Sequence, residues 1–195
     1  MMTRRCWASR WMVGMAVAMA LVVTHAARAE DAKPVSPEAA DALALLGSGD
    51  AYERQKGFLR LEALRDPGTV DAIRPYVDSK DPELRAYSLR ALAAIEGVRV
   101  VPLLLERLRS DQHPRVRRAA LLGLEPLAGG APTILPALIA ALRDRKTEVR
   151  MAAIDIVSRI DDPRAREAIA VRTRRERDRD VRRVLALAAK RMATR

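Results

Sequence analysis

The chain has few of the side chains that build reaction centres. Its 195 residues include one cysteine and two histidines, and aromatic residues make up only 3%. The cysteine is Cys6 and one histidine is His25, so residues 30–195 contain no thiol and a single imidazole, His113. A disulfide, a cysteine-based metal centre or a histidine cluster needs several such groups. The sequence therefore excludes a disulfide and a cysteine-based metal centre after residue 29, and it predicts no metal site and no cofactor.

Motifs of catalysis are missing as well. The sequence has no glycine-rich phosphate loop, no Ser/His/Asp set and no Cys/His pair. His113 lies directly before Pro114 at the expected start of a helix, where capping explains it better than catalysis does. We therefore predict a protein that is not an enzyme and has no small-molecule substrate.

Positive charge is concentrated at the two ends of a chain whose net charge is +11. Residues 163–195 hold 12 Lys/Arg and 4 Asp/Glu, whereas residues 30–162 hold 20 Lys/Arg and 21 Asp/Glu. Six arginines of the last segment, named here the C-terminal arginine block, are candidate partner-binding residues: Arg172, Arg174, Arg175, Arg177, Arg179 and Arg183. The block suits a solvated end of the fold, and it also suits a docking surface for an acidic protein or a membrane surface. Nucleic acid is disfavoured because the chain is expected to be exported.

Residues 1–29 have the pattern of an export signal peptide. Arginines within residues 4–10 precede an uncharged apolar run, Trp11–Val23, of 23 − 11 + 1 = 13 residues, and Ala27-Arg28-Ala29 follows as a small-x-small cleavage pattern. The run is shorter than the about 20 residues that span a bilayer. We predict cleavage near Ala29 and a periplasmic or secreted protein. Arg4-Arg5 resembles a twin-arginine motif, so that the twin-arginine and general secretory routes both stay open.

A linker over residues 30–35 and an N-terminal capping helix over residues 36–48 are expected next. Ser36 can cap the helix, Pro37 suits its first turn and Glu38 complements its dipole. A stack of repeats needs such a cap at its end.

A short motif with a central arginine then returns at a nearly constant interval. Arg85, Arg117, Arg150 and Arg182 are separated by 117 − 85 = 32, 150 − 117 = 33 and 182 − 150 = 32 residues, and Arg54 marks a weaker copy at 85 − 54 = 31. A period of this length predicts stacked helical hairpins rather than one globular core with a central pocket.

Proline and glycine divide each repeat into two expected helices. The expected pairs are residues 50–65 with 68–78, 82–96 with 98–109, 114–127 with 132–143, and 147–160 with 163–176, followed by a last helix over 179–193. Apolar residues at −1, +4, +7 and +10 from the repeated arginine fall on one helical face, which neighbouring helices must cover. The repeat domain is therefore expected to span residues 49–195 with about four to five repeats.

The repeated arginine lies on the apolar side of its helix, so it needs a partner or a route to water. An acid precedes it by six residues in three copies, and Ser79 takes that place before Arg85. We predict a structural ladder of ion pairs between repeats that involves Arg85, Arg117, Arg150, Arg182, Asp111, Asp144 and Glu176.

The repeat resembles the HEAT repeat. Asp81–Ser110 contains Asp-Pro-x-Leu-Arg-x-x-x-Leu-x-x-Leu, then a glycine and a helix with the pattern Pro-Leu-Leu-Leu-x-x-Leu. The most similar type is the short HEAT-like repeat first noted in phycobilin lyases, and the resemblance covers about residues 50–192. It implies an all-α fold, a right-handed α-solenoid of HEAT-like helical hairpins, whose second helices line a concave surface that binds proteins. Metal-dependent hydroxylases of similar fold use His-Glu motifs, and no His-Glu pair occurs here.

Together these features predict a non-catalytic scaffold of the cell envelope. It would bind a protein or peptide along its second helices, and an acidic partner if the C-terminal arginine block takes part. Two alternatives stay open. One is an accessory or lyase-like helper for a cofactor-bearing envelope protein, and the other is a basic nucleic-acid binder if the leader is not used.

Overall fold

The structure is a computed structural model that describes residues 33–129 and 132–194. The expected leader, residues 1–29, lies outside the described residues, as do residues 30–32 of the expected linker. The described helices all belong to one compact unit, Val35–Arg195, the second of two units into which the chain divides.

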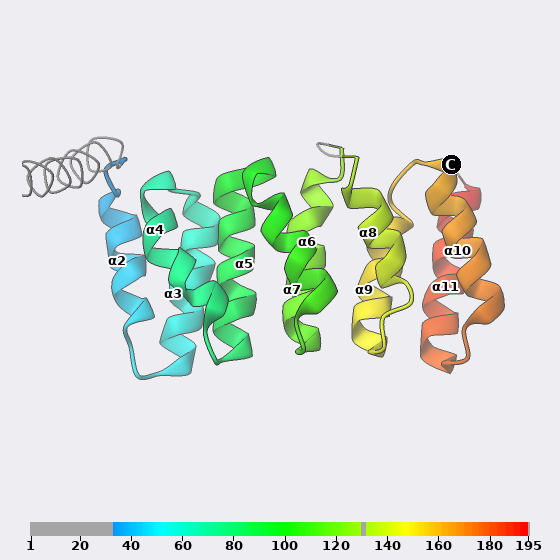
Figure 1. The fold of residues 1–195 in the computed structure, drawn as a ribbon, viewed down its shortest axis with the longest axis horizontal. Helices are drawn as coiled ribbons and strands as arrows, with labels where there is room; N and C mark the ends of the chain where they lie inside the picture. The colour runs from blue at the N-terminus through cyan, green and yellow to red at the C-terminus, as the bar shows by residue number, and fades with distance from the viewer. Residues whose placement is uncertain (1–32, 130–131, 195) are drawn as a thin grey trace, which may run out of the picture. The chain divides into compact units, whose positions relative to one another are not determined.

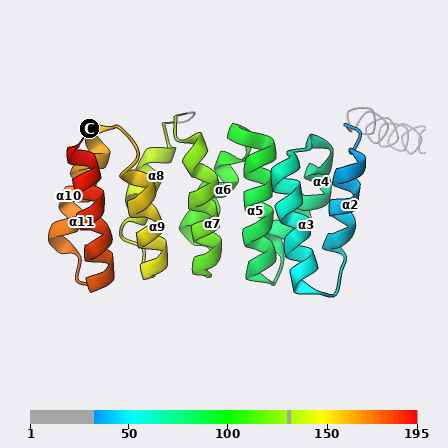
Figure 2. The same cartoon turned by 180° about the vertical axis from the view of Figure 1, so that it is seen from behind.

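Helices of the second unit lie side by side in two rows (Figures 1 and 2). The first row contains α3 (Ala51–Leu64), α5 (Pro82–Glu96), α7 (Pro114–Leu124), α9 (Thr147–Val157) and α11 (Arg179–Ala193). The second row contains α4 (Val70–Ile73), α6 (Val101–Ser110), α8 (Ile134–Ala141) and α10 (Pro163–Arg175). Each first-row helix packs against the next one along its row, and α6, α8 and α10 pack in the same order. The unit is therefore the all-α solenoid of helical hairpins that the repeat period predicts.

One further helix, α2 (Pro37–Leu46), packs against α3. The Ser36 hydroxyl caps it by accepting a hydrogen bond of 3.3 Å from the amide of Ala39. Ala39, Ala42 and Leu46 are buried. The helix thus begins where the Ser-Pro-Glu sequence predicts, and it ends two residues before the expected residue 48.

The apolar positions counted from the repeated arginine form the core between the rows. Buried residues at +4 and +7 are Leu89, Leu92, Leu121, Leu124, Ile154 and Val157. Second-row helices bury Val101, Leu104, Leu108, Leu135 and Leu138 against them, and Leu142, directly after α8, is buried as well. In α11 the same two positions hold Ala186 and Ala189, and both are exposed because no described helix packs beyond α11 in its row.

Proline changes two of the expected helices. Residues 67–78, expected as one helix from residue 68, form η1 (Pro67–Thr69), α4 and η2 (Arg74–Asp78), where η denotes a 3₁₀ segment. Pro75 has no N–H to continue α4, so the chain tightens into the 3₁₀ form. Pro126 has the same effect after α7, which ends at Leu124 and is followed by η4 (Glu125–Leu127).

The remaining helices differ from expectation only at their ends. Gly97 stops α5 with a φ of 58°, which glycine adopts without strain, and η3 (Gly97–Val100) leads into α6. The expected helices 132–143 and 147–160 are shorter in the structure, as α8 and α9.

Candidate functional site

The repeated arginines form ion pairs with carboxylates of the following repeat. The nitrogen–oxygen distances are 3.0 Å for Arg85–Asp111, 2.7 Å for Arg117–Asp144 and 3.1 Å for Arg150–Glu176. We call these three pairs the ion-pair ladder. Each arginine is on a first-row helix. Asp111 and Glu176 directly follow α6 and α10, and Asp144 lies three residues after the end of α8, so that every pair joins two repeats.

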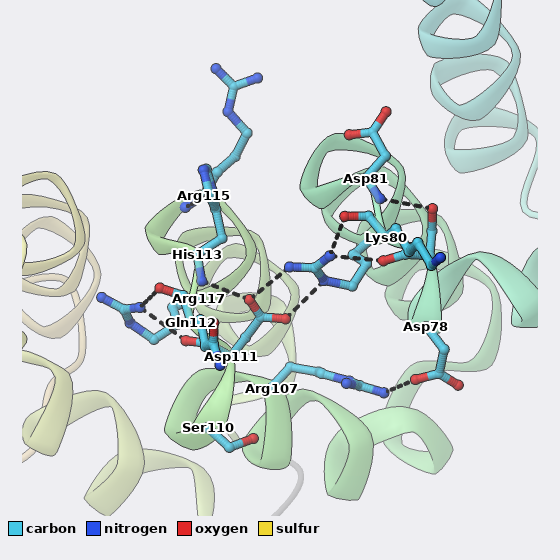
Figure 3. Close-up of polar contacts among 12 residues, drawn as sticks. Asp78, Lys80, Asp81, Arg107, Ser110, Asp111, Gln112, His113, Arg115 and Arg117 are labelled. Atoms are coloured by element: carbon cyan, nitrogen blue, oxygen red, sulfur yellow. Dashed lines mark hydrogen bonds and ion pairs between the residues drawn. The ribbon is translucent and has the colours of Figure 1, made fainter.

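Asp111 shows how one acid connects three segments (Figure 3). Its carboxylate accepts hydrogen bonds from Arg85 at 3.0 and 3.1 Å and from the amide of His113 at 2.8 Å. Its main-chain carbonyl oxygen accepts a hydrogen bond of 3.0 Å from Nη1 of Arg117 in its own repeat. The acid six residues before an arginine therefore pairs with the arginine of the preceding repeat, and it supports its own arginine through the backbone.

These hydrogen bonds keep the carboxylates of the ladder ionised. Burial raises the pKa of Asp111 and Asp144, but hydrogen bonds from Arg85 and Arg117 and from backbone amides outweigh it, and both pKa values lie below the ordinary value. Burial also opposes the shift of Glu176, yet bonds from the Asp178 amide and neighbouring arginines lower its pKa to about 2. Each charged group of the ladder is thus already partnered within the fold.

Arg182, expected as the fourth arginine of the ladder, does not belong to it. It is exposed, and among the described residues no carboxylate pairs with it. Glu176, six residues before Arg182, pairs with Arg150 instead. No described second-row helix follows α11, and the carboxylates of the ladder each follow such a helix.

The ladder is also incomplete at Arg54, the weakest copy. Nη1 of Arg54 donates to the carbonyl oxygens of Ser48 and Gly49 at 2.8 and 2.9 Å, and Nη1 of Arg85, Arg117 and Arg150 donates in the same way to carbonyl oxygens of their own repeats. Its buried Nε has no hydrogen-bond partner. The residue at the position that holds Asp111 in the next repeat is Ser79, which carries no carboxylate.

The single described histidine has a local structural contact. Nδ1 of His113 accepts a hydrogen bond of 3.3 Å from the amide of Arg115 at the start of α7, as the capping prediction requires. Across the described ranges, no group of three or more His, Cys, Asp or Glu residues is placed to hold a metal ion. Nor is any helix within those ranges both long and apolar enough to cross a bilayer.

Two adjoining cavities lie along the second-row helices. One, of about 540 Å³, is lined by residues of α6 and α8, and the other, of about 300 Å³, by residues of α8 and α10. Arg143 lines both, and we call the two cavities together the second-helix groove. Apolar side chains along it include Leu105, Pro136, Ala137, Ile139, Ala140, Ala168 and Val171.

Three arginines at the C-terminal ends of successive second-row helices line this groove. They are Arg109 in α6, Arg143 directly after the turn that ends α8, and Arg175 in α10. Their separations, 143 − 109 = 34 and 175 − 143 = 32, follow the repeat. All three are exposed, and none forms an ion pair with another described residue. We call them the arginine row.

The C-terminal arginine block is divided between this groove and other surfaces. Arg172 and Arg175 line the groove, but Nε of Arg172 donates to Glu176 at 3.0 Å. Nη1 of Arg183 lies 3.9 Å from Asp180. Arg174, Arg177 and Arg179 are exposed, and no described carboxylate pairs with them.

Sequence reasoning missed Arg109 and Arg143 as candidate binding residues. It grouped the arginines by their closeness along the chain, and the region around these two has little net charge. The spacing of 34 and 32 residues between second helices was the signal that could have found them, because stacked repeats place equivalent positions side by side.

Comparisons with known proteins agree with this geometry. The family model for HEAT repeats matches residues 39–125 and 102–190. The complex of CpcE and CpcF of phycocyanin lyase from Nostoc sp. PCC7120 contains a similar structure, with 26% identity over 77% of this chain and 96% of that chain and a TM-score of 0.61. An engineered protein is less similar, at 19% identity over 78% of each chain and a TM-score of 0.47. No curated protein matches the sequence. With its matched segments running from residue 39 to residue 190, the chain belongs to the HEAT repeat family.

Proposed function

We propose that the protein is a non-catalytic scaffold of the cell envelope that binds a protein partner through the second-helix groove. The observation that carries the proposal is the groove itself, which has apolar side chains along its length and three arginines without an ion-pair partner. Protein interfaces combine an apolar centre with arginine in this way.

The ion-pair ladder offers no comparable surface. Arg117 and Arg150 are buried, and each already forms an ion pair with a carboxylate of the following repeat. Their charges hold repeats together, whereas the charges of the arginine row face the groove. The location in the envelope rests on the export pattern of residues 1–29, with the general secretory and twin-arginine routes both open.

Site-specific photo-crosslinking tests where a partner binds. A photoreactive amino acid would replace Ala140, exposed in the groove, or Ala63, an exposed alanine on α3 of the other row. After irradiation in the native host, we expect one defined adduct from the Ala140 position and none from Ala63. Equal adducts from both positions, or an adduct from Ala63 alone, would contradict the proposal.

Export is tested separately. The protein recovered from the envelope fraction should begin near Glu30, because cleavage is expected after Ala29. A full-length chain that stays in the cytoplasm would remove the envelope part of the proposal and leave the groove part standing.

A second candidate is an accessory protein that helps a cofactor-bearing envelope protein. It is favoured by the likeness to the CpcE and CpcF complex of phycocyanin lyase, which extends over 96% of that chain. Protein purified from its native host would then carry a chromophore visible in its absorption spectrum, while a colourless preparation would speak for the scaffold.

A further inference from the structure

We infer that the arginine row binds an acidic, extended segment of the partner that runs across the second-row helices, with a carboxylate at about every third residue. This inference rests on the proposed function and specifies the chemistry of the partner. Its basis is the repetition of an unpaired arginine at the same end of α6, α8 and α10.

The spacing follows from the geometry of stacked helices. Packed helices lie about 8–10 Å apart, so equivalent side chains on successive second-row helices recur at about that interval. An extended chain in the polyproline II conformation advances about 3.1 Å per residue with three residues per turn, so every third side chain lies on the same face at about the same interval. Arginine presents a planar fork that matches a carboxylate, and one acid could therefore face each arginine of the row.

The other charged groups lining the groove are mostly neutralised within the fold. Arg164 and Asp162 form an ion pair of 2.8 Å, and Arg172 pairs with Glu176. The carboxylate of Asp144 belongs to the ladder through Arg117. Glu167 is the one lining acid without an ion pair among the described residues, so three free arginines stand against one free carboxylate.

A cavity on the first-row helices provides the contrast. It is lined by Arg90, Arg115 and Arg118 together with Glu148. Arg90 donates to Glu62 at 2.8 Å, and Arg115 pairs with Glu83. Two of its three arginines are thus neutralised by carboxylates of the fold, and the surface lacks a repeated row of free cations.

The lining also favours a peptide over other polyanions. Single-stranded nucleic acid is usually held by aromatic side chains on which bases stack, and no aromatic side chain lines the groove. A membrane surface is flat and would leave the groove unfilled. Small apolar side chains between the acids of a peptide would instead contact Leu105, Ala140 and Val171.

Binding of two labelled peptides to the full chain tests the inference. One peptide carries glutamate at every third position with alanine and leucine between, and the other has the same composition with its glutamates contiguous. By fluorescence anisotropy at low salt, we expect the periodic peptide to bind more tightly by on the order of tenfold. The triple variant Arg109→Gln/Arg143→Gln/Arg175→Gln should lose that advantage.

The matched control is Arg60→Gln/Arg99→Gln/Arg118→Gln. These three arginines are exposed and without an ion pair among the described residues, so the control removes the same charge away from the groove. We expect its affinity for the periodic peptide to stay within about twofold of the original. Thermal unfolding of both variants by circular dichroism verifies that they fold.

Several results would overturn the inference. Among them are equal affinity for the two peptides, an equal loss in the control variant, and binding to phosphatidylglycerol vesicles or an oligonucleotide without binding of the periodic peptide. If the Ala140 crosslink persists in the arginine-row variant, this inference fails while the proposed function stands. If no adduct forms at Ala140 even in the original protein, the proposed function itself is contradicted, and with it the inference that rests on it.

Discussion

Arg117 on α7 and Asp144 after α8 belong to successive repeats and form an ion pair that is nearly removed from solvent. Nε of Arg117 lies 2.7 Å from Oδ2 of Asp144, and Nη2 lies 2.7 Å from Oδ1. The two side chains are 4% and 11% exposed. This two-pronged geometry compensates the cost of burying both charges, and it links one hairpin to the next.

Removing either partner of this pair should destabilise the fold strongly. Arg117→Met or Asp144→Asn leaves the opposite charge buried without its partner, and we expect the free energy of unfolding to fall by about 3 kcal/mol. Urea unfolding followed by circular dichroism measures it. The exposed inter-repeat pair Arg115–Glu83 is the control, because Arg115→Met should cost less than about 1 kcal/mol. Similar losses at the two sites would show that burial does not set the strength of these pairs.

Acid should weaken the fold through Glu176. Its pKa is lowered from 4.5 to about 2, so its carboxylate stabilises the folded state above about pH 4.5 and this contribution is lost as the pH falls toward 2. Glu176→Gln should therefore lower the free energy of unfolding at pH 7, by on the order of 2 kcal/mol. The difference between the two proteins should shrink in urea titrations at pH 3. A difference that is the same at both pH values would refute this assignment.

Ser79→Asp should stabilise the protein by completing the ladder at Arg54. An aspartate at residue 79 would offer a carboxylate to the buried, unpaired Nε of Arg54, and it could still accept the hydrogen bond that Ser79 takes from the Asp81 amide. We expect the free energy of unfolding to rise by about 1 kcal/mol. In an Arg54→Met background the gain should vanish, and a gain that persists there would have another cause.

Gly57→Ala should destabilise the contact between α2 and α3. A Cβ at Gly57 would lie 2.8 Å from the carbonyl oxygen of Ala42 and 2.9 Å from Cδ2 of Leu46. The two helices would have to separate, and we expect a loss of about 1–3 kcal/mol in thermal or urea unfolding. Gly49→Ala is the control, since no atom lies within 4 Å of a Cβ placed there. A loss at Gly57 no larger than at Gly49 would mean that the helices adjust freely.

Local sequence signals located most of the helices. The proline starts and apolar stripes predicted helices over 82–96 and 179–193, which are the bounds of α5 and α11. The same signals overestimated the helix expected over 68–78. There the hydrophobic period continues through Pro75, while the missing amide of that proline breaks the α-helical hydrogen bonding.

Local sequence signals also predicted part of the ladder. An arginine on an apolar stripe requires a partner, and the repeated acids supplied candidates. That Asp111 pairs with Arg85 rather than with Arg117 depends on how one hairpin stacks on the next. Arg182 has the repeated sequence motif, but no described carboxylate pairs with it. In the other repeats that carboxylate follows the next second-row helix.

By itself, the sequence determined the repeat, the amphipathic helices and the all-α solenoid, because period and burial pattern are properties of each hairpin. Only the tertiary structure decided which charges remain free. Arg172 lies within the C-terminal arginine block yet is bound by Glu176, while Arg109 and Arg143, far apart in the chain, share one groove with Arg175. Neighbours across repeats are set by stacking, and stacking brings together residues that are more than 30 positions apart.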